Sequence, residues 1–325
     1  METMASSTAI THDAPVFFEA AGETLFGVVS EPTSTSAALG VVLVNGGAQV
    51  PSPGRSRIHT RLAHRLAAGG FRVLRFDYHG AGDSTGSVDA FRLNRPFIED
   101  LSAGVAVLGL RGVDRYIFVG RCFGARTALA TASTMPNVAG LVLIALPVRD
   151  QEKDEFGTRS LTPERSVWRY GRRALRPSVI RDLLRTDRRG GYMRMARVVW
   201  RSRRARSSVR NRRRSPLLMQ IGAVVERRIP VLLLTGTEGR AAREFREAMS
   251  SEFGEAIEAP GSKVDVRTLQ GDLGAFADVG THEAVTGLIA AWIEGVHRVS
   301  ESSPRRRLRT GAPASSATSR DPGDP

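Results

Sequence analysis

Short apolar runs alternate along this chain with longer segments in which apolar residues recur every three or four positions. Continuous runs such as residues 40–44 are typical of strands covered on both faces, whereas Ile58, Leu62 and Leu66 form one stripe of a helix. The pattern predicts strands at residues 16–19, 24–29, 40–44, 71–76, 116–119, 140–146, 231–234 and 263–269, with the first two forming a hairpin. It predicts helices at residues 58–68, 96–110, 125–133, 241–250 and 281–296. This alternation indicates an α/β protein with a mostly parallel sheet wrapped by helices.

One long segment interrupts the alternation. Residues 147–227 begin acidic, turn strongly basic, and carry tryptophan, tyrosine and methionine within helical stretches. We therefore predict a helical cap inserted into a core that residues 16–146 and 228–298 form. We expect residues 1–15 to be a flexible lead-in and residues 299–325, rich in Pro, Ser, Arg and Gly, to be a disordered basic tail.

The net charge of +14 is concentrated in the predicted cap and tail. Residues 159–214 hold twenty arginines against three acidic residues. This basic surface is either a solvated face or a docking surface for an anionic partner, such as an acidic carrier protein, a phosphate-bearing acyl donor, lipid head groups or nucleic acid. Lysine occurs only at Lys153 and Lys263, and such an Arg:Lys ratio can reflect genome composition. No nucleic-acid-binding module is recognisable, so nucleic acid is the least favoured partner.

Cysteine count and hydropathy limit the class of protein further. The single cysteine excludes an internal disulfide and a multi-cysteine metal site, and we expect neither a metal nor a cofactor. No window of eighteen residues is apolar throughout, which predicts that no transmembrane segment is present. The first fifteen residues lack a basic region followed by an apolar core, so we expect a cytoplasmic protein without a secretory signal.

The central motif is Gly-Arg-Cys-Phe-Gly at residues 120–124, between an apolar strand and an alanine-rich helix. This order predicts the strand–turn–helix bend of a nucleophile elbow, with Cys122 where serine is more usual. Glycines two residues on either side are expected because larger side chains would collide in so tight a turn. A helix N-terminus favours the thiolate form of such a cysteine. The alternative is that Cys122 is a small buried hydrophobic residue.

A second glycine-rich turn follows the strand at residues 40–44. Gly46 and Gly47 stand where the backbone N–H groups of a central strand end can approach a ligand oxygen. Together with the N–H of Phe123, these groups are the predicted oxyanion hole. The alternative is an ordinary strand-to-loop turn.

The sequence resembles the α/β-hydrolase superfamily. It is most similar to the serine-aminopeptidase/lysophospholipase-like branch, and within that branch to hydrolases associated with exosortase systems. The resemblance extends over residues 16–298 and is carried by the motifs at residues 44–47, 62–78, 80–84 and 120–125. It implies an eight-stranded, mostly parallel sheet with a cap insertion. Relatives in this group can also carry cysteine in the elbow.

The resemblance also implies a nucleophile–histidine–acid triad, whose partners depart from the family pattern here. Glu238 is the nearest acid after the strand at residues 231–234, although Gly239 stands where an aspartate is expected. Gly274 stands where the histidine is expected. His282, in the first turn of the closing helix, is therefore the predicted base, with a structural or capping histidine as the alternative. His79 is a lesser candidate, and the other four histidines are predicted to be structural or on the surface.

Three functions remain open at this point. The first is hydrolysis of an ester, a thioester or another small acyl substrate by Cys122, His282 and Glu238. The second is a carrier-protein-dependent acyltransferase whose basic cap binds an acidic donor. The third is a hydrolase-fold protein that has lost catalysis and binds a ligand or partner, which Gly239 and Gly274 favour.

Overall fold

The computed structural model describes residues 12–32, 38–47, 51–88, 90–149, 152–154, 215–274 and 279–302. The strands are β1 (His12–Ala20), β2 (Glu23–Glu31), β3 (Leu39–Val44), β4 (Arg72–Phe76), β5 (Ala90–Arg92), β6 (Arg115–Arg121), β7 (Val138–Ile144), β8 (Glu152–Asp154), β9 (Val231–Gly236) and β10 (Val264–Leu269). The helices are η1 (Arg55–Arg57), α1 (Ile58–Ala68), α2 (Ile98–Gly109), α3 (Phe123–Thr134), α7 (Pro216–Glu226), α8 (Gly239–Met249), α9 (Glu252–Ile257) and α10 (Val279–Ser302). Most of the predicted cap, all of its arginine-rich part, most of the lead-in and nearly all of the tail lie outside the described residues.

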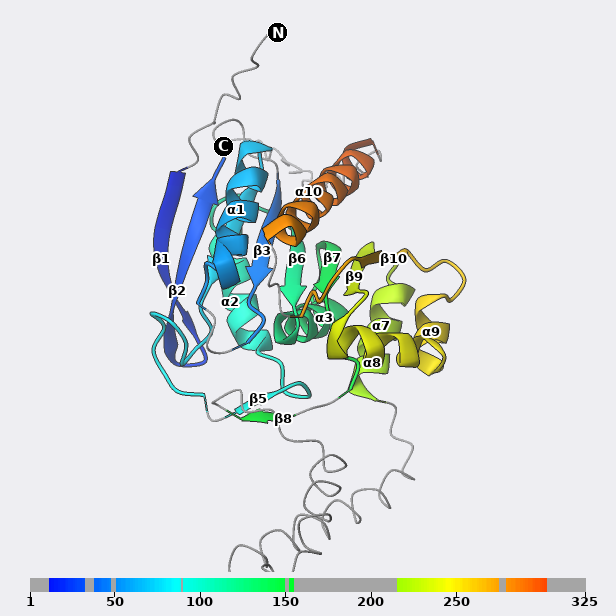
Figure 1. The fold of residues 1–325 in the computed structure, drawn as a ribbon. Coiled ribbons are helices and arrows are strands. Elements are labelled where there is room, and N and C mark those ends of the chain that lie inside the picture. The colour runs from blue at the N-terminus through cyan, green and yellow to red at the C-terminus, as the bar shows by residue number, and fades with distance from the viewer. Residues whose placement is uncertain are drawn as a thin grey trace, which may run out of the picture.

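Eight strands form one sheet in the order β1-β2-β4-β3-β6-β7-β9-β10 (Figure 1). Only β2 runs antiparallel to its neighbours, and all the other pairs are parallel. The sheet confirms the predicted eight-stranded, mostly parallel architecture, including the hairpin that turns at Ala21 and Gly22. A separate antiparallel pair, β5 with β8, was not predicted.

The central strands are buried on both faces because their alternate side chains enter two different hydrophobic clusters. In β3, Val42 and Val44 join the cluster that contains residues of α2, α3 and α7. Val41 and Leu43 join the opposite cluster, with residues of α1 and α10. Burying each such side chain stabilises the fold by roughly 1.5–3 kcal/mol. A continuous apolar run, rather than an alternating one, is the pattern that such a strand requires.

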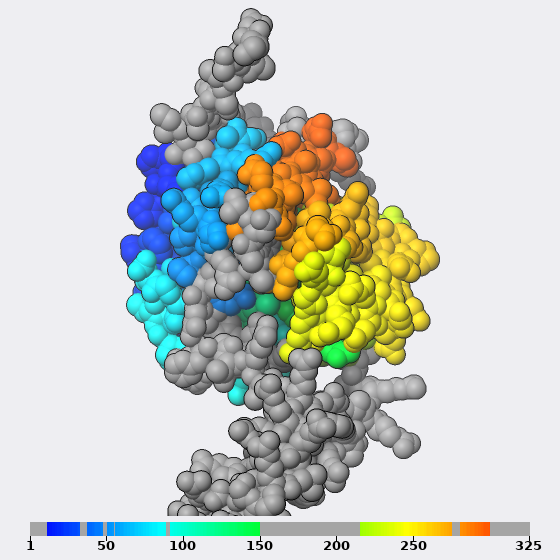
Figure 2. All heavy atoms as spheres, in the orientation of Figure 1, coloured from blue at the N-terminus to red at the C-terminus, as the bar shows by residue number. Residues whose placement is uncertain are grey.

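Helices α1 and α10 cover one face of the sheet and contact each other (Figure 2). An ion pair between Arg65 and Glu283 joins them at 3.6 Å, and both side chains are largely exposed. Such a pair contributes at most about 1 kcal/mol, so the apolar cluster beneath it fixes the two helices. Within the described part of the chain, every helix is too short or too polar to cross a bilayer.

Helix α7 lies within the range that the sequence assigns to the cap. It begins with a proline in its first turn, a position where the missing N–H is not needed. Its buried residues Leu217, Ile221 and Val224 join the core cluster and pack against α3 and α9. The chain has therefore returned to the core by residue 216, whereas the other boundaries of the cap stay a prediction.

Candidate active site

Cys122 lies in the sharp bend between β6 and α3, at φ 52° and ψ −114°. This conformation is sparsely populated for residues with a side chain, so the surrounding structure must hold it in place. A Cβ at Gly120 would overlap the carbonyl oxygen of Gly124, and a Cβ at Gly124 would overlap those of Val44 and Asn45. The two flanking glycines are thus required by close backbone contact, as the motif predicts.

The backbone around Cys122 is held by hydrogen bonds to the neighbouring strand and helix. Its N–H donates to the carbonyl oxygen of Ile144 at 2.9 Å, and its own carbonyl accepts from the N–H of Ala125 at 3.1 Å. The residue is partly exposed and occupies the N-cap position of α3. The partial positive charge of a helix N-terminus favours an anion at this position. The geometry is that of a nucleophile, and the role itself stays a prediction.

The predicted oxyanion groups come from two adjacent strands. Val44 of β3 pairs with Gly120 of β6, so the turn at Gly46 and Gly47 leaves the sheet beside the elbow. Gly47 has φ 151°, a value that side chains rarely allow. Phe123 is the first residue of α3, where backbone N–H groups have no partner within the helix. The topology therefore brings the three predicted residues to the same edge of the sheet.

Arg121 is a buried cation at this edge that the sequence reasoning did not single out. Its side chain is close to Gly46, and its Nη1 donates to the carbonyl oxygen of Gly274 at 2.9 Å. Gly274 stands where the family resemblance places the histidine. The guanidinium therefore links the turn after β3 to the loop after β10, and a guanidinium cannot accept a proton as an imidazole does.

His282 lies in the first turn of α10 and is 1% exposed. It precedes Val285 and Ile289 on the inward stripe of the helix, and both of these residues belong to a core cluster that includes residues of β7 and β9. Its backbone carbonyl accepts a hydrogen bond from the Thr286 hydroxyl at 2.9 Å. The predicted base, His282, is therefore deeply buried. A histidine that only packs in the core or caps a helix would be buried in the same way, so burial does not separate the two roles. The catalytic role of His282 stays a prediction.

A carboxylate that the sequence did not predict lies against Gly239, where the family resemblance places the acid of the triad. A Cβ at Gly239 would overlap the carboxylate of Asp272, which belongs to the loop after β10. The same carboxylate accepts the N–H of Gly274 at 2.8 Å. Glu238 is exposed at the N-cap position of α8, and no hydrogen bond of the described residues joins its carboxylate to His282. Asp272 thus occupies the space that the missing side chain at Gly239 leaves.

His79 is another imidazole of the candidate site and follows the carboxyl end of β4. Its Nδ1 lies 2.8 Å from the buried carboxylate of Asp100, which also accepts the backbone N–H of His79 at 3.0 Å. The ring packs on Phe97 with a centroid distance of 4.4 Å, and the side chain is 26% exposed. A carboxylate that orients a partly exposed imidazole is the arrangement a general base requires.

His59 provides a test of burial at this edge of the protein. Burial away from water, reinforced by the charge of Arg121, lowers the pKa of His59 to about 3. Because its pKa is near 6.5 in the unfolded chain, acid protonates the unfolded state first, and stability falls as the pH drops from 6.5 towards 3. We expect the fold to lose about 2 kcal/mol between pH 8 and pH 5 through this residue alone.

The measurement is urea unfolding of the wild type and His59→Gln at a series of pH values. Other acidic and basic groups titrate in both proteins, so the difference between the two curves isolates His59. His12→Gln, at an exposed position, serves as the matched control. If the free energy of unfolding falls equally with decreasing pH in His59→Gln and in the wild type, His59 is not held neutral by the fold.

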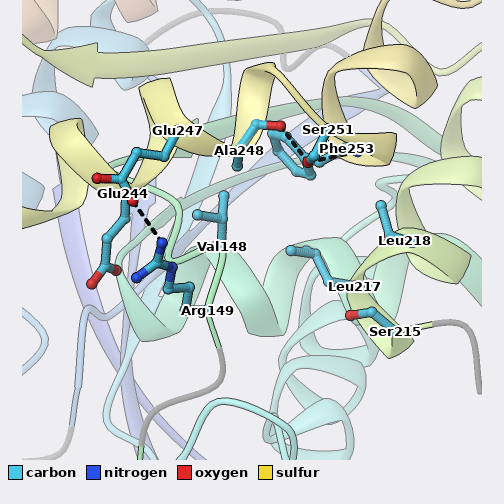
Figure 3. Close-up of a pocket in the computed structure, with 10 residues that line it drawn as sticks. All are labelled: Val148, Arg149, Ser215, Leu217, Leu218, Glu244, Glu247, Ala248, Ser251 and Phe253. Atoms are coloured by element: carbon cyan, nitrogen blue, oxygen red, sulfur yellow. Dashed lines mark hydrogen bonds and ion pairs between the residues drawn. The ribbon is translucent and has the colours of Figure 1, made fainter. Parts of the chain in front are cut away.

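A pocket of about 320 Å³ lies where the described chain leaves the core at Arg149 and returns at Ser215 (Figure 3). Its lining is mixed, with apolar side chains such as Leu217 and Phe253 beside polar and charged ones, and Arg149 and Glu247 in that lining form an ion pair with a 2.6 Å separation. This volume is at the small end for a small-molecule site. None of the predicted site residues lines it, so the pocket does not by itself locate the chemistry. Among the described residues, no cluster of three or more His, Cys, Asp or Glu is arranged to hold a metal ion.

The sequence matches the model of the α/β-hydrolase family over residues 41–279. Because this match spans well over half of its length, the chain belongs to that family. A search of curated proteins found no match.

Solved structures share the fold at low sequence identity. One is an esterase from Pyrococcus furiosus, with a TM-score of 0.56, 14% identity, and coverage of 88% of this chain and 91% of that chain. Another is a hypothetical protein from Pseudomonas aeruginosa, with a TM-score of 0.54, 17% identity, and coverage of 91% and 98%. A third is an α/β serine hydrolase homologue from Coxiella burnetii, with a TM-score of 0.51, 16% identity, and coverage of 87% and 99%.

Proposed function

We propose that this α/β-hydrolase cleaves an ester or thioester of a small acyl substrate through a covalent adduct on Cys122. The observation that carries the proposal is the strained bend that places Cys122 at the N-terminus of α3, beside the turn at Gly46 and Gly47. Strain of this kind persists only where the surrounding structure imposes it, and it is concentrated at functional sites.

The proposed reaction has two steps. The Cys122 thiolate attacks the acyl carbon, and the alcohol or thiol leaves with a proton. Water then attacks the thioester on Cys122, which releases the acid and regenerates the thiol. The N–H groups of Gly46, Gly47 and Phe123 would stabilise the negative oxygen in both steps. Esters and thioesters suit this nucleophile because their leaving groups compete with a thiolate, whereas the amine of an amide does not.

The proposal assigns His282 as the base, with Glu238 or Asp272 as the acid that orients it. Asp272 is added because its carboxylate lies against Gly239, where the family resemblance places the acid. We also propose that the chain is related to the exosortase-associated hydrolases and that it acts in the cytoplasm. A carrier-dependent acyltransferase would use the basic cap, which lies outside the described residues.

A second candidate function is ligand or partner binding without catalysis. It is favoured by Arg121, whose guanidinium bonds the carbonyl of Gly274 where an imidazole is expected. The burial of His282 points the same way, since a buried imidazole can serve structure as well as chemistry.

The two functions are separated by acylation of Cys122 with p-nitrophenyl acetate, followed by mass spectrometry. If His282 is the base, His282→Asn is expected to slow acylation by about 10²- to 10⁴-fold, whereas His79→Asn changes it less than threefold. The reverse order would make His79, with Asp100, the base. Alkylation of Cys122 by iodoacetamide controls for access to the thiol. If the wild type is alkylated but not acylated, the binding function replaces the hydrolase.

A further inference from the structure

The peptide group between Asn45 and Gly46 is held from one side by a tyrosine. The Tyr78 hydroxyl donates to the carbonyl oxygen of Asn45 at 3.1 Å. The carbonyl of Asn45 and the N–H of Gly46 belong to one planar trans peptide, in which the two groups point in opposite directions. A bond that fixes the direction of the carbonyl therefore fixes the direction of the Gly46 N–H as well.

Tyr78 is itself firmly held. It is 1% exposed, and its ring packs edge-on against Phe76, Phe97 and Phe123, with centroid distances of 5.5, 5.1 and 5.9 Å respectively. Burial raises the pKa of the Tyr78 phenol, so the group keeps its proton and remains a donor at any physiological pH. A fixed ring with a permanent donor holds a peptide more rigidly than a mobile side chain does.

Tyr78 contacts both halves of the predicted oxyanion site, Asn45 through its hydroxyl and Phe123 through its ring. Asn45 leads into Gly46 and Gly47, while Phe123 follows Cys122 and supplies the third predicted N–H. The Asn45 side chain adds a second tie, because its Nδ2 donates to the carbonyl oxygen of Phe76 at 3.1 Å. The end of β3 is thus bound to the end of β4 by two hydrogen bonds that involve one residue, Asn45.

We propose that Tyr78 is a positioning residue of the oxyanion site, whose hydroxyl holds the Asn45–Gly46 peptide so that the Gly46 N–H faces the acyl oxygen. The hydrogen bond at the carbonyl also polarises the peptide and makes its N–H a stronger donor. This role rests on the proposed function, since it needs an acyl group on Cys122. Tyr78 acts through Gly46 and does not itself touch the substrate.

The test is Tyr78→Phe, which removes the hydroxyl and keeps the ring. Losing one oxyanion donor outright typically costs 10²- to 10³-fold in rate. We expect a displaced donor to slow acylation of Cys122 by p-nitrophenyl acetate at least about tenfold. Alkylation by iodoacetamide forms no oxyanion, so its rate is expected to stay within about twofold of the wild type. A change confined to acylation is a result that mere loss of packing would not give.

Tyr116→Phe is the matched control. The Tyr116 hydroxyl also donates to a backbone carbonyl, that of Val113 at 2.8 Å, and the residue is 8% exposed. It lies near the start of β6, at the opposite end of the strand from Cys122. We expect Tyr116→Phe to leave both rates unchanged.

Two kinetic results would overturn the inference. One is acylation of Tyr78→Phe at the wild-type rate, and the other is an equal fall in acylation and alkylation. A crystal structure of Tyr78→Phe provides a measurement that does not depend on catalysis, because the Asn45–Gly46 peptide should be reoriented in it. An unmoved peptide overturns the inference even if the wild type is acylated. Absence of acylation in the wild type overturns the proposed function, and with it the role of Tyr78 in an oxyanion site, whether or not the peptide moves.

Discussion

Cys122→Gly is expected to abolish acylation of the protein and, at the same time, to stabilise its fold by about 1 kcal/mol. The first effect follows because the variant has no thiol. The second follows because glycine adopts φ 52° without the cost that a side chain imposes. Opposite changes in activity and stability are what a strained functional residue produces.

The measurements are mass spectrometry after exposure to p-nitrophenyl acetate and urea unfolding of the wild type and variant. Ala21→Gly is the matched control, since Ala21 has φ 52° in the exposed turn between β1 and β2. It should stabilise the fold to a similar extent and leave acylation unchanged. If Cys122→Gly is less stable than the wild type, the elbow holds no strain that glycine can relieve.

Gly124→Ala is expected to destabilise the fold by about 3 kcal/mol or more, which is at the severe end for a single methyl group. Its Cβ would overlap the carbonyl oxygens of Val44, the last residue of β3, and of Asn45, which follows it, and both are backbone atoms. Such atoms move only if α3 separates from β3. The change should therefore also displace the predicted oxyanion turn.

Gly222→Ala is the control for Gly124→Ala, because Gly222 lies in α7 and an added Cβ would have no atom within 4 Å apart from its chain neighbours and the nearby backbone of its own helix. Alanine favours the helix over glycine by up to about 1 kcal/mol, so this variant should be slightly more stable than the wild type. Urea unfolding of the two variants measures both effects. A loss below about 1 kcal/mol in Gly124→Ala would mean that the helix and strand adapt more easily than their packing indicates.

The candidate site divides into a local part and a long-range part. The elbow was predictable because one short segment carries the strand, both glycines and the start of the helix. The partners of Cys122 were harder to predict, because each comes from a different element. Arg121 and Gly274, for example, are hydrogen-bonded across 153 positions in sequence. Nothing near either residue in the sequence indicates that contact.

Asp272 shows how a missing side chain can be a signal. The sequence drew attention to Gly239 because an acid was expected there, and it proposed the neighbouring Glu238 instead. The structure places a carboxylate from another loop against that glycine. A glycine where the family pattern calls for a functional side chain was thus a reason to search the facing loops. Nothing in the sequence distinguishes one of those loops from another.

By itself, the sequence determined the order along the chain of the eight strands of the main sheet, the two-sided burial of the central strands and the strained position of Cys122. These features depend on hydrophobic periodicity and on the steric demands of neighbouring residues, which are local properties. Only the tertiary structure decided that Tyr78 holds the Asn45 carbonyl, that Asp100 orients His79 and that Arg121 reaches Gly274. Those contacts join the ends of different strands and loops, and they exist only once the sheet has brought those ends together.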